Sequence, residues 1–178
     1  MIELLHKHEN LFNRDFRADS PNKKWVTDIS YIHTREGVLY LSVTRDLYDL
    51  SIVSYKVGTE QTVNLVVNTI KASVKKEKVT GELQLHSDQG LQYTSKRYFN
   101  LTKGYGITAS ISRRGNCYDN AVVENFFGIL KAECINRQKI ENFKQTCQLI
   151  DEYIYFYSYE RIQLKTKLTP YEKRCQFA

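Results

Sequence analysis

The sequence lacks any long apolar run, and no stretch approaches the roughly 18 consecutive apolar residues that a membrane-spanning helix needs. The N-terminus, MIELLHKHENLFNRDFRADS, has neither the apolar centre nor the small-residue cleavage site of a secretory signal peptide. Internal repeats and low-complexity tracts are also absent. These absences predict a cytoplasmic protein without a membrane partner.

Cysteine and histidine are scarce, with four residues of each. No two cysteines form a C-x-x-C pair, which favours free thiols in a reducing compartment. The histidines do not cluster with the cysteines at the spacing of zinc ligands. The sequence therefore predicts neither a disulfide framework nor a structural zinc site. The positions are Cys117, Cys134, Cys147 and Cys175, and His6, His8, His33 and His86.

Positive charge is in excess, with a formal net charge of +6. A basic balance favours a polyanionic partner such as nucleic acid, although many basic proteins bind none. The last 18 residues carry one acid, Glu172, and five bases, which are Arg161, Lys165, Lys167, Lys173 and Arg174. This stretch is interpreted either as a phosphate-binding segment or as a solvated tail.

Apolar residues make up 42% of the chain, which suffices for a core. We divide the sequence into a polar lead-in over residues 1–22, a core domain over 23–160 and a basic tail over 161–178. Five runs of β-forming residues, bounded by turn residues, predict strands. They are WVTDISYIH (25–33), VLYLSVTRD (38–46), LSIVSYKV (50–57), ELQLHSD (82–88) and ITASIS (107–112).

Four segments with apolar residues at helical spacing predict helices, over about 60–76, 94–105, 119–138 and 141–157. Thr94 or Ser95 is the expected cap of the second helix, and Asp119 or Asn120 of the third. The aromatic run YIYFYSY in the last helix is interpreted as core packing. The order β-β-β-α-β-α-β-α-α predicts an α/β fold, with a five-stranded mixed sheet of three antiparallel and then two parallel strands and with helices on both faces.

Three acids stand out by their placement. Asp28 lies in the middle of the first strand, Asp88 directly follows the short fourth strand, and Glu124 lies in the first turns of the third helix. Converging carboxylates repel one another unless cations lie between them, and oxygen ligands favour Mg²⁺ or Mn²⁺. Two such ions serve nucleases and strand transferases. The alternative is that three of twenty acids look interesting by chance.

The spacing and the local motifs favour the metal site. Between Asp28 and Asp88 there are 59 residues, and between Asp88 and Glu124 there are 35. The second interval resembles the D-D-35-E signature of retroviral integrases and related bacterial transposases. The motifs that resemble the insertion-sequence branch are KWVTDISYI (24–32), LHSDQGLQYTS (85–95), SRRGNCYDNAVVENFFGILKAE (112–133) and YERIQLKTKLTPYEKR (159–174).

This resemblance implies a ribonuclease H-like fold and a DDE transposase, which cleaves and joins DNA strands with Mg²⁺ or Mn²⁺, as two ions. It assigns Asp28, Asp88 and Glu124 as catalytic residues and metal ligands. It also implies element ends and target DNA as partners, a homo-oligomer assembled on DNA, and a bacterial cytoplasmic protein associated with the nucleoid.

Four further residues are candidates for DNA contacts. Lys131 lies two helical turns after Glu124 on the same face, where a basic residue contacts the DNA end in integrase-like enzymes. The alternative for Lys131 is an ordinary helix lysine. Arg113 and Arg114 lie in a glycine-containing loop and are candidate phosphate ligands. His86 either touches phosphate or orients the turn before Asp88, and the second interpretation is favoured.

One departure from the family pattern concerns the N-terminus. Full-length relatives carry a helix-turn-helix region that recognises the element ends, whereas here the first motif begins at residue 24. We therefore expect end-specific transposition to need more than this chain. Two alternative functions stay open, a ribonuclease H-like nuclease and a non-catalytic remnant that binds DNA or inhibits a transposase.

Overall fold

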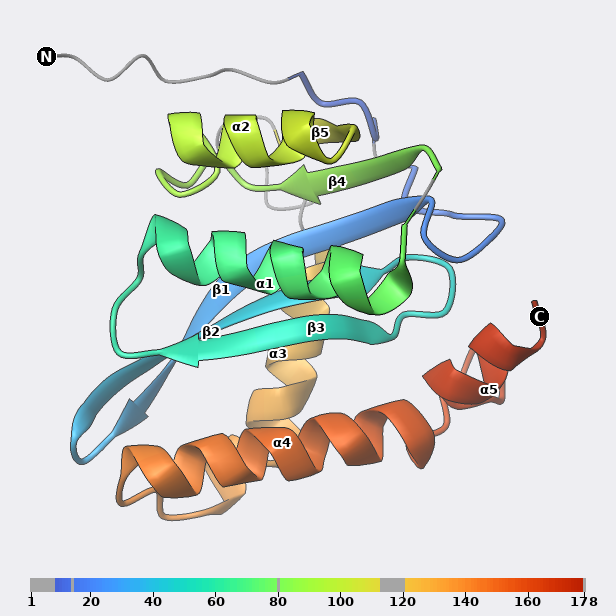
Figure 1. Ribbon diagram of the computed structural model, residues 1–178. Coiled ribbons are helices and arrows are strands. Elements are labelled where there is room, and N and C mark those ends of the chain that lie inside the picture. Colours follow the sequence, from blue (N-terminus) through green and yellow to red (C-terminus); the bar gives the residue numbers. More distant parts are fainter. Residues whose placement is uncertain (1–8, 14, 80, 113–120, 178) are drawn as a thin grey trace, which may run out of the picture.

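A five-stranded mixed sheet forms the centre of the protein (Figure 1). The computed structural model describes residues 9–13, 15–79, 81–112 and 121–177. The strands are β1 (Lys24–Thr34), β2 (Gly37–Asp46), β3 (Ile52–Gly58), β4 (Leu83–Ser87) and β5 (Ile107–Ile111). Their order is β3-β2-β1-β4-β5. The three N-terminal strands are antiparallel, whereas β4 is parallel to β1 and β5 is parallel to β4, which confirms the predicted sheet.

Helices cover both faces of the sheet, as predicted (Figure 1). On one face lie α1 (Val63–Glu77) and α2 (Lys96–Gly104), and on the other lie α3 (Ala121–Glu133) and α4 (Phe143–Tyr159). Side-chain caps set three of the helix starts, because a cap oxygen accepts from a backbone N–H that has no partner within the helix. These caps are Thr62, Ser95 and Asn142.

The predicted third helix is shorter in the structure than in the sequence analysis. It ends at Glu133 and continues as the 3-10 turn η2 (Ile135–Arg137). Its predicted caps, Asp119 and Asn120, lie outside the described residues. The start of α4 falls two residues later than expected, because Asn142 caps it.

Two hydrophobic clusters hold the helices to the sheet. The cluster on the α3 and α4 face contains Val26 of β1 together with Val123 and Phe126 of α3. The cluster on the α1 and α2 face contains Trp25 of β1 and Tyr98 of α2. Burial of the predicted apolar side of α3 is confirmed for Val123, Phe126, Phe127, Leu130 and Cys134.

The aromatic run of α4 is only partly core. Tyr153 and Tyr157 are buried, whereas Tyr155, Phe156 and Tyr159 are 60%, 40% and 49% exposed. The run covers all sides of the helix, so core packing holds only for the side that faces the sheet. Free thiols are confirmed at Cys134, Cys147 and Cys175, and Cys117 lies outside the described residues.

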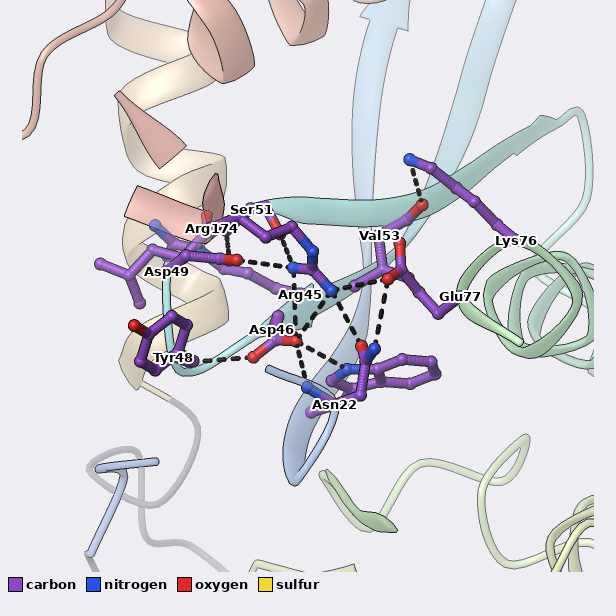
Figure 2. A network of polar contacts seen from close by, with 12 residues as sticks. Asn22, Arg45, Asp46, Tyr48, Asp49, Ser51, Val53, Lys76, Glu77 and Arg174 are labelled. Atoms are coloured by element: carbon purple, nitrogen blue, oxygen red, sulfur yellow. Dashed lines mark hydrogen bonds and ion pairs between the residues drawn. The ribbon is translucent and has the colours of Figure 1, made fainter. Parts of the chain in front are cut away.

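The basic C-terminal stretch is not a solvated tail. It contains helix α5 (Pro170–Cys175), which begins with a capping box between Thr169 and Glu172. The Arg174 guanidinium donates to Asp49 at 2.6 Å and to Glu77 at 2.7 Å (Figure 2). Arg174 thus joins the chain end to the β2–β3 turn and to the end of α1.

The acids around Arg174 are almost completely buried, with side chains of Asp46 and Asp49 that are 0% exposed. Burial and the neighbouring Asp49 carboxylate raise the pKa of Asp46. Burial lowers the pKa of Arg174, but the carboxylates of Asp49, Glu77 and Asp46 outweigh it and raise that pKa overall. Arg174 is therefore held charged among acids, and its charge is not available to DNA phosphates.

Candidate active site

Asp28 lies in β1, and Asp88 directly follows β4, the parallel neighbour of β1. The register of β1 and β4 pairs Val26 with His86, and each aspartate follows its paired residue by two positions. Asp28 and Val26 lie on the same face of β1, since side chains alternate along a strand. That face is the one packed against α3. Both aspartates are half-buried, so their carboxylates remain accessible to an ion.

The turn after β4 holds the Asp88 carboxylate. The Gly90 N–H donates to Asp88 Oδ1 at 2.8 Å, and the Gly90 carbonyl accepts from the Tyr93 N–H at 2.9 Å. A Cβ atom at position 90 would lie 2.9 Å from Asp88 Oδ1 and 3.1 Å from Gln92 Oε1. Glycine is therefore the residue that lets the turn close around this carboxylate.

Backbone also holds Asp28, because the N–H of Ile29 donates to Asp28 Oδ1 at 2.7 Å. The N–H of Gly90 does the same for Asp88 Oδ1. One oxygen of each aspartate is thus held by the backbone, which fixes the orientation of the carboxyl group.

Glu124 lies on the exposed side of the first turn of α3. The N-terminal turn of this helix is anchored by Arg45 of β2, whose guanidinium donates to the Val122 carbonyl at 2.6 Å and to the Tyr157 hydroxyl. Burial lowers the pKa of Arg45, although Tyr157 and Asp49 oppose this. Arg45 thus ties the turn that carries Glu124 to the sheet.

Sequence reasoning missed Arg45, and the available signal was a pair of charged residues, Arg45 and Asp46, at the end of β2. It also missed Tyr93, which lies within the motif LHSDQGLQYTS and is 2% exposed. Burial, followed by the charges of Asp28 and Asp88, raises the pKa of Tyr93. The side chain of the neighbouring Thr27 lowers this pKa and only partly offsets the rise. A buried, neutral phenol thus lies in the electric field of both carboxylates.

The donor set fits a hard cation, because three carboxylates offer only oxygen ligands. The strand register places Asp28 and Asp88 together. Among residues 9–13, 15–79, 81–112 and 121–177, however, no group of three or more His, Cys, Asp or Glu side chains is close enough to hold a metal ion. Convergence of Glu124 with the two aspartates therefore stays a prediction.

His86 lies in the interior of the protein. Its side chain is 0% exposed, its Nδ1 lies 2.8 Å from Ser110 Oγ, and its ring stacks on Phe12 with centroids 4.8 Å apart. The imidazole packs against Phe12 of the N-terminal segment, and a contact of His86 with DNA stays a prediction. The favoured interpretation, that His86 orients the chain before Asp88, agrees with this burial.

Of the other candidate DNA contacts, Lys131 is half-buried, and its Nζ lies 4.8 Å from the ring centroid of Tyr31. Tyr31 is 54% exposed, so this ammonium–aromatic pair forms part of the surface. Arg113 and Arg114 lie outside the described residues. In the C-terminal stretch, Arg161 is bound to Glu133 at 2.7 Å and is therefore paired within the protein.

Comparison with known protein families places these residues in context. The chain matches the Integrase core domain over residues 18–117 and again over 124–177. It is 44% identical to the transposase InsK of insertion sequence IS150 from Escherichia coli K12, over 94% of the chain and 59% of that protein. It is 41% identical to a transposase-like protein of Haemophilus influenzae, over 98% of the chain and 81% of that protein. The chain thus spans about three fifths of the length of the first of these relatives.

Solved structures resemble the fold at low sequence identity. The catalytic core of HTLV-2 integrase, solved with magnesium in a trimeric form, matches with a TM-score of 0.70 and 16% identity, over 89% of this chain and 99% of that one. An intasome of simian T-cell lymphotropic virus matches with a TM-score of 0.78 and 14% identity, over 97% of this chain and 59% of that one. These likenesses confirm the ribonuclease H-like fold. In the parts of the chain that the structure describes, no helix is long and apolar enough to cross a membrane.

Proposed function

Because the chain belongs to the integrase core domain family, we propose that it is the catalytic core of an insertion-sequence transposase, which cuts and joins DNA strands. The observation that carries the proposal is the parallel pairing of β1, which contains Asp28, with β4, which Asp88 directly follows. Element ends and target DNA are its substrates. The chain acts as a homo-oligomer on DNA, in the bacterial cytoplasm at the nucleoid.

In this proposal Asp28 of β1 and Asp88, which directly follows β4, hold divalent cations, and Glu124 completes the site from α3. Two bound Mg²⁺ ions would activate an attacking oxygen and stabilise the leaving oxygen of a phosphodiester. The protein itself supplies positioning, through the turn at Gly90 and the anchor at Arg45. Positioning of this kind is a large part of the catalysis of phosphoryl transfer.

The test is a strand-transfer assay with a pre-cut DNA end. Joining is expected with Mg²⁺ or Mn²⁺ and poorly with Ca²⁺, whose looser coordination suits binding more than in-line displacement. An RNA–DNA hybrid and a four-way junction are offered in parallel, because a ribonuclease H-like nuclease would cut these and join nothing. Full activity in excess chelator, or cleavage of the hybrid alone, would refute the proposed function.

The Gly90→Ala substitution is expected to impair metal binding with little effect on folding. The added Cβ would lie 2.9 Å from Asp88 Oδ1, so the carboxylate must turn away from its bond to the backbone N–H. Groups that orient metal ligands typically contribute about 10- to 100-fold in metal affinity, and we expect a loss within that range. Joining rates measured over a series of Mg²⁺ concentrations give the shift in half-saturation.

Gly104→Ala is the matched control for this substitution, because a Cβ there meets no atom within 4 Å. Thermal unfolding of both variants separates a local effect from a loss of fold. A Gly90→Ala protein with the Mg²⁺ dependence of the wild type would show that the Asp88 carboxylate tolerates a different orientation.

The Lys131→Ala substitution is expected to weaken DNA binding uniformly across sequences. If Lys131 contacts one phosphate, its loss should lower the slope of log affinity against log salt by about 0.9 for duplex DNA. Loss of the contact with Tyr31 should destabilise the fold by no more than about 1 kcal/mol, as is usual for an exposed cation–π pair. Titration of one labelled duplex at several salt concentrations measures the slope.

Lys139→Ala serves as the control, since Lys139 is exposed and lies beyond the end of α3. Its slope should equal that of the wild type. Equal slopes and equal joining rates for Lys131→Ala would assign Lys131 to packing against Tyr31 alone.

A further inference from the structure

The segment that precedes β1 is bonded to the parallel side of the sheet. The N–H of Ile111 on β5 donates to the Glu9 carbonyl at 3.1 Å, and the N–H of Leu11 donates to Ser110 Oγ at 2.9 Å. These bonds join residues that are about a hundred positions apart in sequence. Glu9 and Leu11 of the lead-in are therefore bonded to strand β5.

Phe12 is the residue by which this segment enters the core. It is 2% exposed and belongs to the hydrophobic cluster that includes Val26 of β1 and Val123 of α3. Its ring also stacks on His86 of β4, with an interplanar angle of 24°. One side chain thus packs among the three elements that carry Asp28, Asp88 and Glu124.

His86 links Phe12 to Asp88, because its ring contacts the Phe12 ring and it precedes Asp88 by two residues. The imidazole lies between the Phe12 ring and the hydroxyl of Ser110, which is 2.8 Å from its Nδ1. The same hydroxyl accepts from Leu11. Because the ring is completely buried, its position fixes the backbone of β4 just before the Asp88 turn.

We propose that Phe12 and Ser110 are positioning residues of the metal site, which hold Asp88 in place through His86. This inference rests on the proposed function, because it assigns the Asp88 carboxylate to a metal ion. The family match begins at residue 18, so Phe12 lies outside it. The working catalytic unit therefore includes the lead-in segment from residue 9, which contributes no ligand of its own.

The experiment measures Mn²⁺ affinity by calorimetric titration, together with the Mg²⁺ dependence of DNA joining, for Phe12→Leu and Ser110→Ala. Leucine keeps an apolar side chain but loses the flat ring that stacks on His86. Alanine at position 110 removes the hydroxyl shared by Leu11 and His86. Each variant is expected to raise the half-saturating metal concentration about tenfold or more, as for other groups that orient metal ligands.

Two control variants report the effect of ordinary core damage. Ile150→Val trims a completely buried side chain of α4 in the same hydrophobic cluster as Phe12. Ser73→Ala removes a buried hydroxyl on α1 that donates to the Thr69 carbonyl at 2.9 Å. Both controls should lose stability and keep the metal affinity of the wild type.

The outcomes separate the inference from the function on which it rests. Wild-type protein that binds Mn²⁺ and joins DNA, with both test variants binding Mn²⁺ equally well, would overturn the inference alone. Wild-type protein that neither binds Mn²⁺ nor joins DNA would overturn the proposed function and the inference together. Should Phe12→Leu fail to fold, the milder Ser110→Ala decides the question.

Discussion

Arg174→Ala is expected to lower the free energy of unfolding by about 3 kcal/mol, at the lower end of what breaking a buried ion pair costs. The guanidinium is 22% exposed and binds Asp49 at 2.6 Å and Glu77 at 2.7 Å, with Asp46 within 3.5 Å. Truncation would leave three acids close together without their cation. Urea unfolding followed by circular dichroism measures the change.

The large effect follows from the burial of the acids. Like charges in a poorly solvated site repel one another, and each lacks the water that would stabilise it. Asp46 has other partners, since the indole N–H of Trp25 donates to its Oδ2 at 3.2 Å and the Asn22 N–H at 2.8 Å. Asp49 depends more on Arg174, so Asp49→Asn in the Arg174→Ala background should recover part of the loss.

Lys165→Ala is the matched control, because it removes an exposed charge from the same basic stretch. Its free energy of unfolding should change by no more than about 0.5 kcal/mol, as is usual for surface sites. Equal stabilities of Arg174→Ala and Lys165→Ala would mean that α5 contributes little to the fold and that the acids are solvated without it.

Most of the sheet could be predicted, because its strands carry local patterns. The run WVTDISYIH alternates between the two faces of β1, with Val26 in one cluster and Trp25 in the other. The start of α2 at Ser95 also follows from a local signal, an oxygen-bearing cap before a helical segment. The parallel orientation of β4 and β5 followed from the alternation of strands with helices.

Contacts between segments that are far apart in sequence could not be predicted from local patterns. Arg174 lies in a run of basic residues, and nothing near it in sequence indicates that Asp49 and Glu77 surround it. Helix α5 was missed although Thr169, Pro170 and Glu172 form a recognisable helix start. Phe12 lies in a polar segment, and its burial depends on a neighbour 74 positions away, His86.

The residues of the candidate site also divide into those with a local signal in the sequence and those without one. Asp28 and Asp88 could be proposed from the sequence because a carboxylate is unfavourable inside a strand such as β1, and because Asp88 directly follows β4, its parallel neighbour. The residues that hold or surround these carboxylates and the start of α3 were not identified from the sequence. They are Gly90, Arg45 and Tyr93. The burial of His86 was not predicted, because its position in the motif carries no information about burial.

Asp28→Asn, Asp88→Asn and Glu124→Gln should each lower the rate of DNA joining by more than about 100-fold, the upper end of what changes in supporting groups cost. An amide has nearly the shape of a carboxylate but lacks the charge that attracts a cation. The oxygen of Asn can still accept from the N–H of Gly90 or Ile29. The substitutions therefore remove charge and leave the local backbone bonds in place.

For Asp28→Asn and Asp88→Asn, the stability of the metal-free protein is expected to rise although the rate of DNA joining falls. Without a cation the negative charges of the two aspartates repel one another, so removing one charge should stabilise the metal-free protein slightly. Added Mn²⁺ should raise the melting temperature of the wild type, because a ligand that binds only the folded state stabilises it by mass action. In Asp28→Asn and Asp88→Asn this rise should shrink or vanish.

Glu82→Gln is the control, since Glu82 is an exposed acid directly before β4 and lies at the opposite end of that strand from Asp88. It should join DNA at the wild-type rate and respond to Mn²⁺ as the wild type does. Opposite changes in stability and activity are a signature that general damage to the fold cannot produce, because damage lowers both. Asp88→Asn protein that melts earlier than the wild type yet keeps its response to Mn²⁺ would assign Asp88 to the structure of the turn and exclude it as a metal ligand.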